Sequence, residues 1–496
     1  MPASREFDWW RRAVFYQVYP RSFADSNGDG VGDLRGIISR LDYLNDDHGG
    51  GLGVDAVWLS PTFPSPMADF GYDVADYCDV DPIFGTLDDM DELIAACHER
   101  GVALLLDYVP NHSSDQHPWF QESRARRDSA KRDWYVWRDP APGGGPPNNW
   151  QSVFGGPAWT FDASTGQYYL HSFLPEQPDL NWRNLELVQA MHDVLRFWFR
   201  RGIDGFRIDV LGRLMKHPDL PDNPPPPDAD PPGLRSYNHN FPDVFEAVRG
   251  MRAVADEFPG RVLVGEVFGS LMSWPGIYGG DALDGLHLAF NFSYIQERAP
   301  DYTPWEAPAL RRIAVSADAA MPGDALPCWA FNNHDRDRFL SRQPDDEYAG
   351  ARARGAALLL LGLRGVPVLY QGEEIGMTNG DVPEEYLQDP ARFHDYSRDP
   401  VRTPMPWNNS PGRGFTTGEP WLPIGDQPTV AGQEGGPGSL LELLPRCDPA
   451  PAPADRRCIR PLPRPLDAGR CLRLPPRCRR LAAGCRCHQH RGIPAR

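Results

Sequence analysis

The chain of 496 residues has almost no lysine, since Lys131 and Lys216 are the only two. Arginine therefore supplies nearly all of the positive charge, a bias that indicates a GC-rich gene. The 50 basic residues are outnumbered by 68 acidic ones, which gives a net charge of −18 and a pI near 5.2. Proteins that bind nucleic acids normally present a basic face. The composition thus argues against a nucleic-acid partner and favours a neutral substrate.

Long apolar runs are also missing. No stretch approaches the roughly 20 apolar residues that a membrane-spanning helix needs, and the N-terminal segment carries charges where a secretory leader would have an apolar core. Of the nine cysteines, only Cys78, Cys97 and Cys328 lie within the first 446 residues, in apolar contexts typical of reduced packing residues. We therefore expect a soluble, monomeric, cytoplasmic protein without a membrane partner.

What the chain does have is a regular alternation of apolar, strand-like stretches with helical patterns. One helix is predicted to begin after Thr86, which forms a capping-box pattern with Asp89. Strand followed by helix, repeated eight times, predicts an α/β protein built on a (β/α)₈ TIM barrel. The predicted strands are 13–19, 54–60, 102–109, 203–210, 261–268, 283–292, 326–333 and 366–371. A helix over 184–201 is predicted to bury Leu185, Val188, Val194, Leu195, Trp198 and Phe199.

Two long insertions interrupt this alternation. The third strand is followed by residues 113–181, rich in Trp, Tyr, Gly and Pro. This stretch is too long for a plain connection and indicates a subdomain inserted over the mouth of the barrel. Residues 216–240 include the run PDNPPPPDADPP, and consecutive prolines favour stiff polyproline II. We expect the second insertion to be a rigid wall rather than a mobile lid.

Four short segments each end a strand-like run with a carboxylate. They are DYVPNH at 107–112, GFRIDV at 205–210, VGEVF at 264–268 and FNNHD at 331–335. In a parallel barrel the C-terminal ends of the strands meet at one mouth. These acids, although far apart in the sequence, are therefore predicted to share one pocket.

These segments, in this order and with QPDLN at 177–181, resemble glycoside hydrolase family 13, the α-amylase family, and within it the oligo-1,6-glucosidase and α-glucosidase group. The resemblance covers residues 8–443. It implies a catalytic barrel made of 1–110 and 182–443, a B domain at 111–181, and a C-terminal antiparallel β domain. It also implies a retaining, exo-acting enzyme that hydrolyses terminal α-1,6 or α-1,4 glucosidic bonds of short oligosaccharides.

Retaining hydrolysis needs one carboxylate that attacks the anomeric carbon and a second, protonated carboxyl group for the leaving oxygen. Asp209 stands two positions after Arg207 on a strand, so both side chains share a face and the guanidinium can keep the aspartate ionised. We assign Asp209 as the nucleophile. Glu266 ends the apolar run RVLVGEV, which would keep it protonated near neutral pH, and is assigned as acid and then base. The resemblance implies the same roles and makes Asp335 the acid that stabilises the transition state.

The resemblance also implies substrate-binding residues. His112 and His334 would hydrogen-bond the sugar in the −1 subsite, while Asp73 and Arg402 would close the pocket around the non-reducing end. Val210, directly after the nucleophile, accompanies α-1,6 activity in the relatives, which favours isomaltose-type substrates. For Asp73 and Arg402 the alternative is a buried ion pair that merely holds barrel loops.

Oxygen-bearing side chains recur at alternate positions early in the chain. Asp25, Asn27, Asp29 and Asp33 provide side-chain oxygens, and Val31 provides a backbone carbonyl. Hard Ca²⁺ prefers such ligands, and the intervening glycines allow a tight turn, although no glutamate occupies the twelfth position of an EF-hand loop. A metal-free, Asx-rich turn is the alternative. The resemblance favours a structural Ca²⁺ or Mg²⁺ that takes no part in the chemistry, with no organic cofactor.

The end of the chain departs from the rest. After Trp421 no aromatic residue occurs in 75 residues, and from Arg446 onward 13 arginines accompany three aspartates. Arg, Pro, Ala, Gly and Cys are what a GC-rich gene yields when it is read out of frame. We interpret residues 444–496 as a frameshifted, disordered tail that replaces the last barrel helix and the C-terminal domain. A zinc site in CRCHQH at 485–490 is a rival interpretation, although the upstream cysteines lack paired spacing.

Two other functions stay open at this point. A transglycosylase or isomerase of the trehalose synthase or sucrose isomerase type would share the acids and differ in how far water is excluded. A catalytically silent binding protein of the same family would usually lack the acids or carry a transmembrane helix. This chain has the acids and no such helix.

Overall fold

The structure, a computed structural model, describes residues 8–46, 50–224, 237–268, 274–295, 303–391, 396–436 and 438–443. The prolines at 225–236 and the tail at 444–496 lie outside these residues, so the rigid wall, the frameshift and the zinc site stay predictions. Cys78, Cys97 and Cys328 are free cysteines, as expected. No helix in the described ranges is long and apolar enough to span a membrane.

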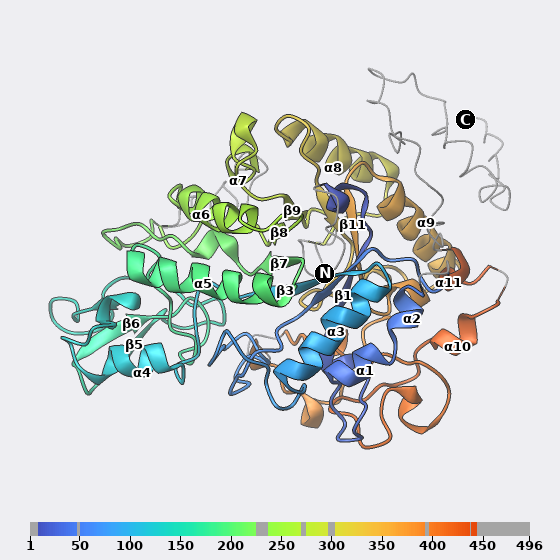
Figure 1. The fold of residues 1–496 in the computed structure, drawn as a ribbon, viewed down its shortest axis with the longest axis horizontal. Coiled ribbons are helices and arrows are strands. Elements are labelled where there is room, and N and C mark those ends of the chain that lie inside the picture. The colour runs from blue at the N-terminus through green and yellow to red at the C-terminus, as the bar shows by residue number, and fades with distance from the viewer. Residues whose placement is uncertain are drawn as a thin grey trace, which may run out of the picture. The chain divides into compact units, whose positions relative to one another are not determined.

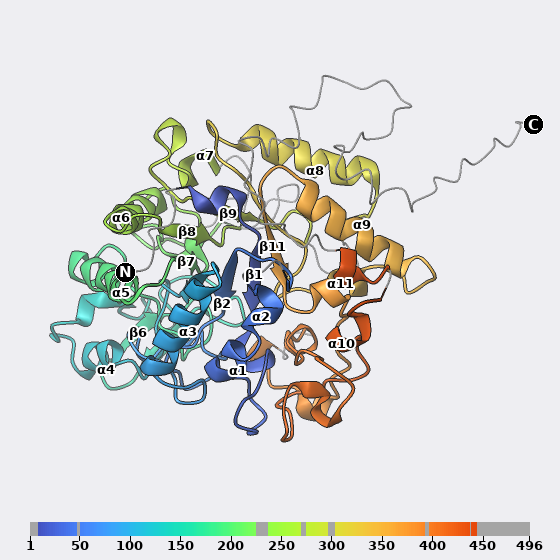
Figure 2. The same ribbon diagram turned by 45° about the vertical axis from the view of Figure 1, so that its right-hand side comes forward.

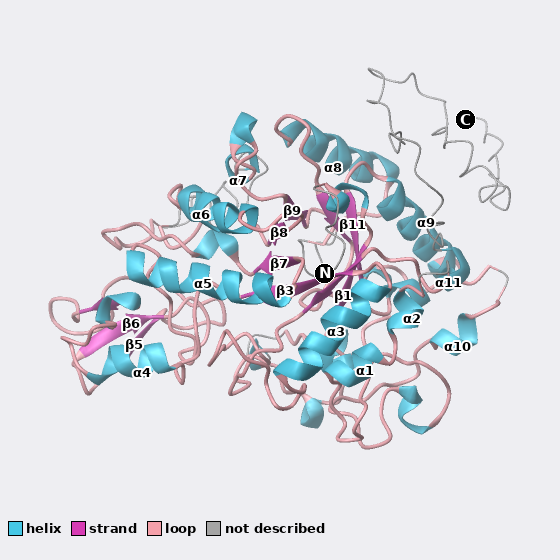
Figure 3. Cartoon of the chain, in the orientation of Figure 1, coloured by secondary structure: helices cyan, strands magenta, loops and turns pink. Residues whose placement is uncertain are grey.

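Eight parallel strands close into a barrel at the centre of the molecule (Figures 1 and 3). Around the barrel their order is β1-β11-β10-β9-β8-β7-β3-β2. Every observed strand lies within its predicted stretch, which confirms the (β/α)₈ fold. The strands are β1 (Phe15–Val18), β2 (Ala56–Leu59), β3 (Ala103–Tyr108), β7 (Gly205–Ile208), β8 (Val262–Gly265), β9 (Leu288–Asn291), β10 (Cys328–Ala330) and β11 (Val366–Tyr370).

The strands are mostly apolar and fully buried because a parallel barrel is covered on both faces. All six residues of β3, ALLLDY, are buried, and the same holds for the four residues of β7 and of β8. Neighbouring strands pair in register from β3 through β7 to β8, with Asp107 opposite Arg207 and Arg207 opposite Val264. This register places the polar residues at the strand ends on one level.

Helices surround the barrel, as the view in Figure 2 shows. The helix α3 (Leu87–Glu99) begins with the predicted capping box between Thr86 and Asp89. The remaining α-helices outside the insertion are α1 (Leu34–Ile38), α2 (Leu41–Leu44), α5 (Leu185–Arg201), α6 (Val244–Asp256), α7 (Trp274–Ile277), α8 (Ala307–Ala320), α9 (Ala349–Gly362), α10 (Val430–Gln433) and α11 (Leu440–Leu443).

The prediction that α5 buries Leu185 is wrong. Leu185 is the first residue of the helix, directly after the N-cap Asn184, and it is 82% exposed. The buried stripe begins two residues later with Leu187 and Met191 and continues through Val194, Leu195, Trp198 and Phe199. The spacing of three and four residues correctly predicts a buried face on this helix, but the prediction placed the start of that face at the wrong residue of the first turn.

The insertion between β3 and α5 contains its own small sheet, at the left of Figure 1. Its strands β4 (Trp137–Arg138), β5 (Trp159–Asp162) and β6 (Gln167–Leu170) pair antiparallel in the order β4-β6-β5, and α4 (Pro118–Ala125) packs beside them. Phe120 stacks on Trp137 with ring centroids 5.7 Å apart. These two rings belong to the main hydrophobic core, whereas Trp150, Ala158, Trp159 and Leu170 form a separate small cluster within the insertion. The boundaries 111–181 stay a prediction.

One of the two lysines ties this insertion to the barrel. The Lys216 ammonium group lies 2.7 Å from the Asp179 carboxylate, at the end of the insertion, and donates to Asn111 at 3.0 Å, after β3. Asp179 also accepts hydrogen bonds from the backbone and hydroxyl of Ser172. Both charges are buried, with side chains 6% and 0% exposed. A buried pair that is fully hydrogen-bonded holds its partners in one geometry.

Replacing Lys216 by Ala should leave the Asp179 charge buried without its partner. We expect the free energy of unfolding to fall by about 3–5 kcal/mol, the usual cost of breaking a buried pair. Lys131, the other lysine, pairs with Glu122 at 2.7 Å on the surface and is the matched control. Lys131→Ala should cost about 0–1 kcal/mol. Urea denaturation of both variants measures the difference, and equal losses would contradict the role given to Lys216.

Candidate active site

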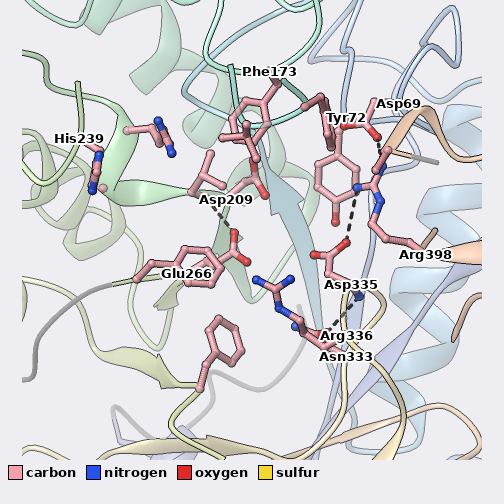
Figure 4. A pocket seen from close by; sticks show the side chains of 18 of the residues that line it. Asp69, Tyr72, Phe173, Asp209, His239, Glu266, Asn333, Asp335, Arg336 and Arg398 are labelled. Atoms are coloured by element: carbon pink, nitrogen blue, oxygen red, sulfur yellow. Dashed lines mark hydrogen bonds and ion pairs between the residues drawn. The ribbon is translucent and has the colours of Figure 1, made fainter. Parts of the chain in front are cut away.

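The predicted acids come together at one mouth of the barrel. Asp209 follows β7, Glu266 follows β8 and Asp335 follows β10, and all three line a cavity of about 330 Å³ (Figure 4). Asp209 and Glu266 are 5% and 3% exposed. The C-terminal ends of the strands converge in a barrel, which explains how residues more than a hundred positions apart share this space.

A single guanidinium group holds three carboxylates together. Arg207 Nη1 lies 2.8 Å from Asp107 and 2.5 Å from Asp209, and its Nη2 lies 2.8 Å from Glu266. Asp209 and Glu266 therefore sit on the two terminal nitrogens of one side chain. Arg207, predicted to lie beside Asp209 alone, serves both members of the expected catalytic pair.

Sharing the guanidinium changes the proton balance of the site. Burial raises the pKa of Asp209 well above its ordinary value; Arg207 opposes this, and the neighbouring charges of Glu266 and Asp107 add to it. Burial likewise raises the pKa of Asp107 to about 6. One positive charge does not offset three buried carboxylates. We infer that this cluster retains a proton near neutral pH instead of being fully ionised, as Arg207 alone would have implied.

The backbone directly after Asp209 is strained and contacts Glu266. Val210 has a φ of 35°, a left-handed conformation that is costly for a β-branched residue. Its N–H donates to Glu266 Oε2 at 3.0 Å. The residue that follows the expected nucleophile thus fixes the orientation of the expected acid.

Asp335 has its own set of partners. Arg402 Nη2 lies 2.9 Å from its carboxylate and Arg398 Nη1 lies 3.5 Å away. Burial alone would raise the pKa of Asp335, but the adjoining His334 ring and the two guanidinium groups lower it below its ordinary value. Asp335 is therefore ionised at any ordinary assay pH, as a group that stabilises developing positive charge must be.

Both predicted histidines are buried and uncharged. His334 bonds to the Tyr72 hydroxyl at 2.6 Å and to the Gln17 amide at 2.7 Å, and burial lowers its pKa to about 3. His112 lines the cavity, bonds to the Tyr72 carbonyl at 3.1 Å, and has a pKa that burial lowers to about 4. Both ring nitrogens of each histidine contact protein groups, and of the two only His112 lines the cavity.

The expected pair of Asp73 and Arg402 does not form. The Asp73 carboxylate is fully buried in its own turn, where it accepts from Ser65 and from the backbone of Ala68 and Asp69, and Arg402 binds Asp335 instead. The sequence offers two candidates for each member of the pair, Asp69 or Asp73 and Arg398 or Arg402. In both cases the two candidates are four residues apart.

The pair that lines the cavity is Asp69 and Arg398, which sequence reasoning missed (Figure 4). Arg398 Nη2 lies 2.6 Å from Asp69 and 2.6 Å from Asp389. Both Asp69 and Arg398 are buried, so they close this end of the cavity. Only the turn geometry, which points Asp69 inward and Asp73 away, distinguishes the two choices.

Aromatic rings form much of the remaining wall. Phe154, Phe173, Phe268 and Phe292 all line the cavity, and Phe268 and Phe292 lie against each other with ring centroids 5.5 Å apart. Phe268 is 37% exposed and Val153 48%, whereas Asp69 is 4% exposed. The cavity therefore runs from a closed, charged end to an open, apolar mouth.

Known proteins match this chain in sequence and in fold. The family model of the alpha amylase catalytic domain matches residues 17–432. The chain belongs to the alpha-amylase family. It is 46% identical over 459 residues to a probable alpha-glucosidase of Rhizobium meliloti (88% of this chain, 81% of the relative), and 40% identical over 449 residues to an oligo-1,6-glucosidase of Heyndrickxia coagulans (84% and 80%).

Solved structures of the alpha-amylase type agree in fold. The alpha-glucosyl transfer enzyme XgtA superposes with a TM-score of 0.81 at 43% identity, over 88% of this chain and 83% of XgtA. The trehalulose synthase MutB from Pseudomonas mesoacidophila MX-45 gives a TM-score of 0.79 at 37% identity, over 88% and 82%. The two predictions made from the sequence, the family and the barrel fold, are thus confirmed.

The predicted metal loop of this family member is satisfied by its own backbone. Asp25 accepts from the N–H groups of Asn27 and Gly28, and Asp29 accepts from Val31. Asp33 caps α1 instead, by accepting from Gly36. In the described part of the chain no three His, Cys, Asp or Glu side chains are grouped so as to hold a metal. These residues fit an Asx-rich turn better than a carboxylate cage, and the cation stays a prediction.

Calcium binding at this loop can be tested through stability alone. If the loop binds the Ca²⁺ that the resemblance implies, through the oxygens of Asp25, Asn27, Asp29 and Val31, Ca²⁺ should raise the melting temperature relative to EDTA, whereas the metal-free turn should show no change. At 100 times Kd the gain would be about 2.7 kcal/mol. Asp29→Asn should weaken the effect, whereas Asp426→Asn, at an exposed position, should not. Equal melting temperatures in Ca²⁺ and EDTA would leave the metal-free turn as the correct interpretation.

Proposed function

We propose that the protein is a retaining, exo-acting α-glucosidase that acts on short oligosaccharides. The observation that carries this proposal is the placement of Asp209 and Glu266 on the two terminal nitrogens of Arg207, inside a cavity with one closed end. Two carboxyl groups close together, one ionised and one protonated, are what retaining glycosidases use. The relatives named alpha-glucosidase and oligo-1,6-glucosidase support the same activity.

In the first step a carboxylate oxygen of Asp209 forms a bond to the anomeric carbon. The glycosidic C–O bond breaks, its electron pair stays on the leaving oxygen, and Glu266 transfers a proton to that oxygen. Asp335, which is ionised, stabilises the positive charge that develops on the sugar ring. His112 lines the cavity, is neutral and is proposed to hold a sugar hydroxyl, while His334 is proposed to act through Tyr72, to which it is hydrogen-bonded. The products are a free alcohol and a glucosyl ester of Asp209.

In the second step water replaces the ester. Glu266, now ionised, accepts a proton from water while the water oxygen bonds to the anomeric carbon, and the electron pair of the ester C–O bond returns to Asp209. Two inversions restore the α configuration. Glu266 delivers a proton in the first step and recovers one in the second, so the carboxylate cluster ends the cycle as it began it. The N–H of Val210 keeps the Glu266 carboxyl group oriented through both steps.

A transfer reaction is the second candidate. The solved structures that are similar in fold include an alpha-glucosyl transfer enzyme and a trehalulose synthase. The aromatic mouth at Phe268 and Phe292 could hold a sugar acceptor in place of water. Identifying the products formed from maltose, isomaltose and sucrose separates the two activities. The kcat/KM ratio of isomaltose to maltose tests the preference that Val210 predicts.

Glu266→Gln should lower kcat/KM on maltose by about 10²–10⁴-fold, the usual contribution of a general acid. The loss should be smaller on p-nitrophenyl α-glucoside, because nitrophenolate leaves without a proton. Asp209→Asn should abolish turnover of both substrates. Wild-type enzyme should release α-glucose first, as followed by proton NMR. Initial release of the β anomer, or undiminished hydrolysis by the Asp209 variant, would contradict the assignment.

The closed end formed by Asp69 and Arg398 predicts exo action. A maltoheptaoside should lose glucose from its non-reducing end, but the same oligosaccharide with its terminal 4- and 6-hydroxyl groups joined by an ethylidene bridge should not be cleaved. Chromatography of the products measures both, and an endo-acting α-amylase that cleaves both is the control. Cleavage of the blocked substrate at internal bonds would show that the cavity is open at both ends.

A further inference from the structure

Two arginines line the cavity without a counterion among the described residues. Arg213 and Arg336 are among its lining residues, yet neither has a side-chain hydrogen bond or an ion pair with any residue in the described ranges. The carboxylates around them already have partners: Arg207 serves Asp209 and Glu266, Arg402 serves Asp335, and Arg398 serves Asp69. Arg213 and Arg336 are therefore not required as direct counterions for these acids.

The backbone places both arginines next to the reacting groups. Arg213 ends the 3₁₀ helix Leu211–Arg213, four residues after Asp209, and Arg336 follows Asp335 directly. The Arg213 guanidinium lies 5.9 Å from the centroid of the Phe173 ring. In the view of Figure 4 the Arg336 guanidinium points into the cavity below the carboxyl groups of Glu266 and Asp335.

Their depth in the cavity indicates which part of a substrate they meet. Asp69 and Arg398 at the closed end are buried, and Phe268 at the mouth is 37% exposed, whereas Arg213 and Arg336 are half-buried. A glucose residue at the closed end would fill the space among Asp69, Asp209 and Asp335. The leaving group beyond Glu266 would then lie beside the half-buried guanidinium groups.

A half-buried guanidinium without a partner is costly. Burial lowers the pKa of Arg213, and Asp179, the only carboxylate that counteracts this, is already paired with Lys216. The fork of N–H donors in an arginine matches the geometry of a carboxylate or a phosphate. In a chain with a net charge of −18, two cavity cations that have no partner among the described residues are a local exception. An anionic ligand would supply that partner.

We propose that the preferred substrates are α-glucosides whose leaving group carries an anionic group, a carboxylate or a phosphate, which Arg213 and Arg336 bind. This inference rests on the proposed α-glucosidase function and narrows its substrate class. It departs from the neutral substrate that the overall charge favours, because a contact at short range depends on local charge rather than on net charge.

The test compares substrates that differ by one anionic group. Maltobionate and maltitol are both α-1,4-glucosides of an open-chain sugar acid or sugar alcohol, and only maltobionate carries a carboxylate. An α-glucoside of glucose 6-phosphate, compared with the same disaccharide without phosphate, forms the second arm. We expect kcat/KM to favour the anionic member of at least one pair by about tenfold or more, since hydrogen bonds to charged groups are the stronger class.

Variants connect this preference to the two side chains. Arg213→Gln and Arg336→Gln should each lower the anionic-to-neutral ratio of kcat/KM, and Arg213→Lys should lower it less. Raising the salt concentration should lower the ratio of the wild-type enzyme. Arg249→Gln, which removes an exposed guanidinium paired with Asp284, should leave the ratio unchanged.

The inference and the proposed function fail in different ways. If maltose and p-nitrophenyl α-glucoside are cleaved but neither anionic substrate is preferred, the two arginines only offset the field of the acids and the inference is wrong. The same conclusion follows if the preference survives both glutamine variants. If no α-glucoside is cleaved at all, the proposed function itself is wrong.

Discussion

The site depends on the way one guanidinium group is shared. Arg207 lies opposite Asp107 in the barrel register and contacts Asp107, Asp209 and Glu266 within 2.8 Å. Like charges would otherwise separate these carboxylates, and burial would protonate them. Because a single cation does not neutralise three acids, the cluster keeps a proton. A retaining glycosidase needs this condition, with one carboxyl group ionised and its neighbour protonated.

The other acids near the cavity are also paired with cations. Asp335 is held ionised between Arg402 and Arg398, Arg398 also closes the cavity against Asp69, and Lys216 fixes the insertion to the barrel through Asp179. Each acid near the cavity thus has an assigned cation. Arg213 and Arg336 differ because no acid in the described part of the chain pairs with them, and this difference carries the inference about the leaving group.

The sequence predicted those features correctly that depend on a single hydrophobic period or a single motif. All eight strands lie within the predicted stretches because buried parallel strands are continuously apolar. Asp209, Glu266 and Asp335 could be found because each ends such a strand. The phase of α5 was missed at Leu185, where the first turn of a helix need not face the core. The rigid wall predicted from the proline-rich insertion and the frameshift predicted for the tail remain predictions.

The sequence by itself determined the barrel, the family and the three acids, since strand periodicity and strand-end residues are local properties. It could not choose between Asp69 and Asp73, or between Arg398 and Arg402, because each pair offers the same chemistry four residues apart. Only the tertiary structure decided them: the turn points Asp73 toward its own backbone and Asp69 toward Arg398. Which charge meets which partner depends on side-chain direction, and that is fixed by packing between distant segments.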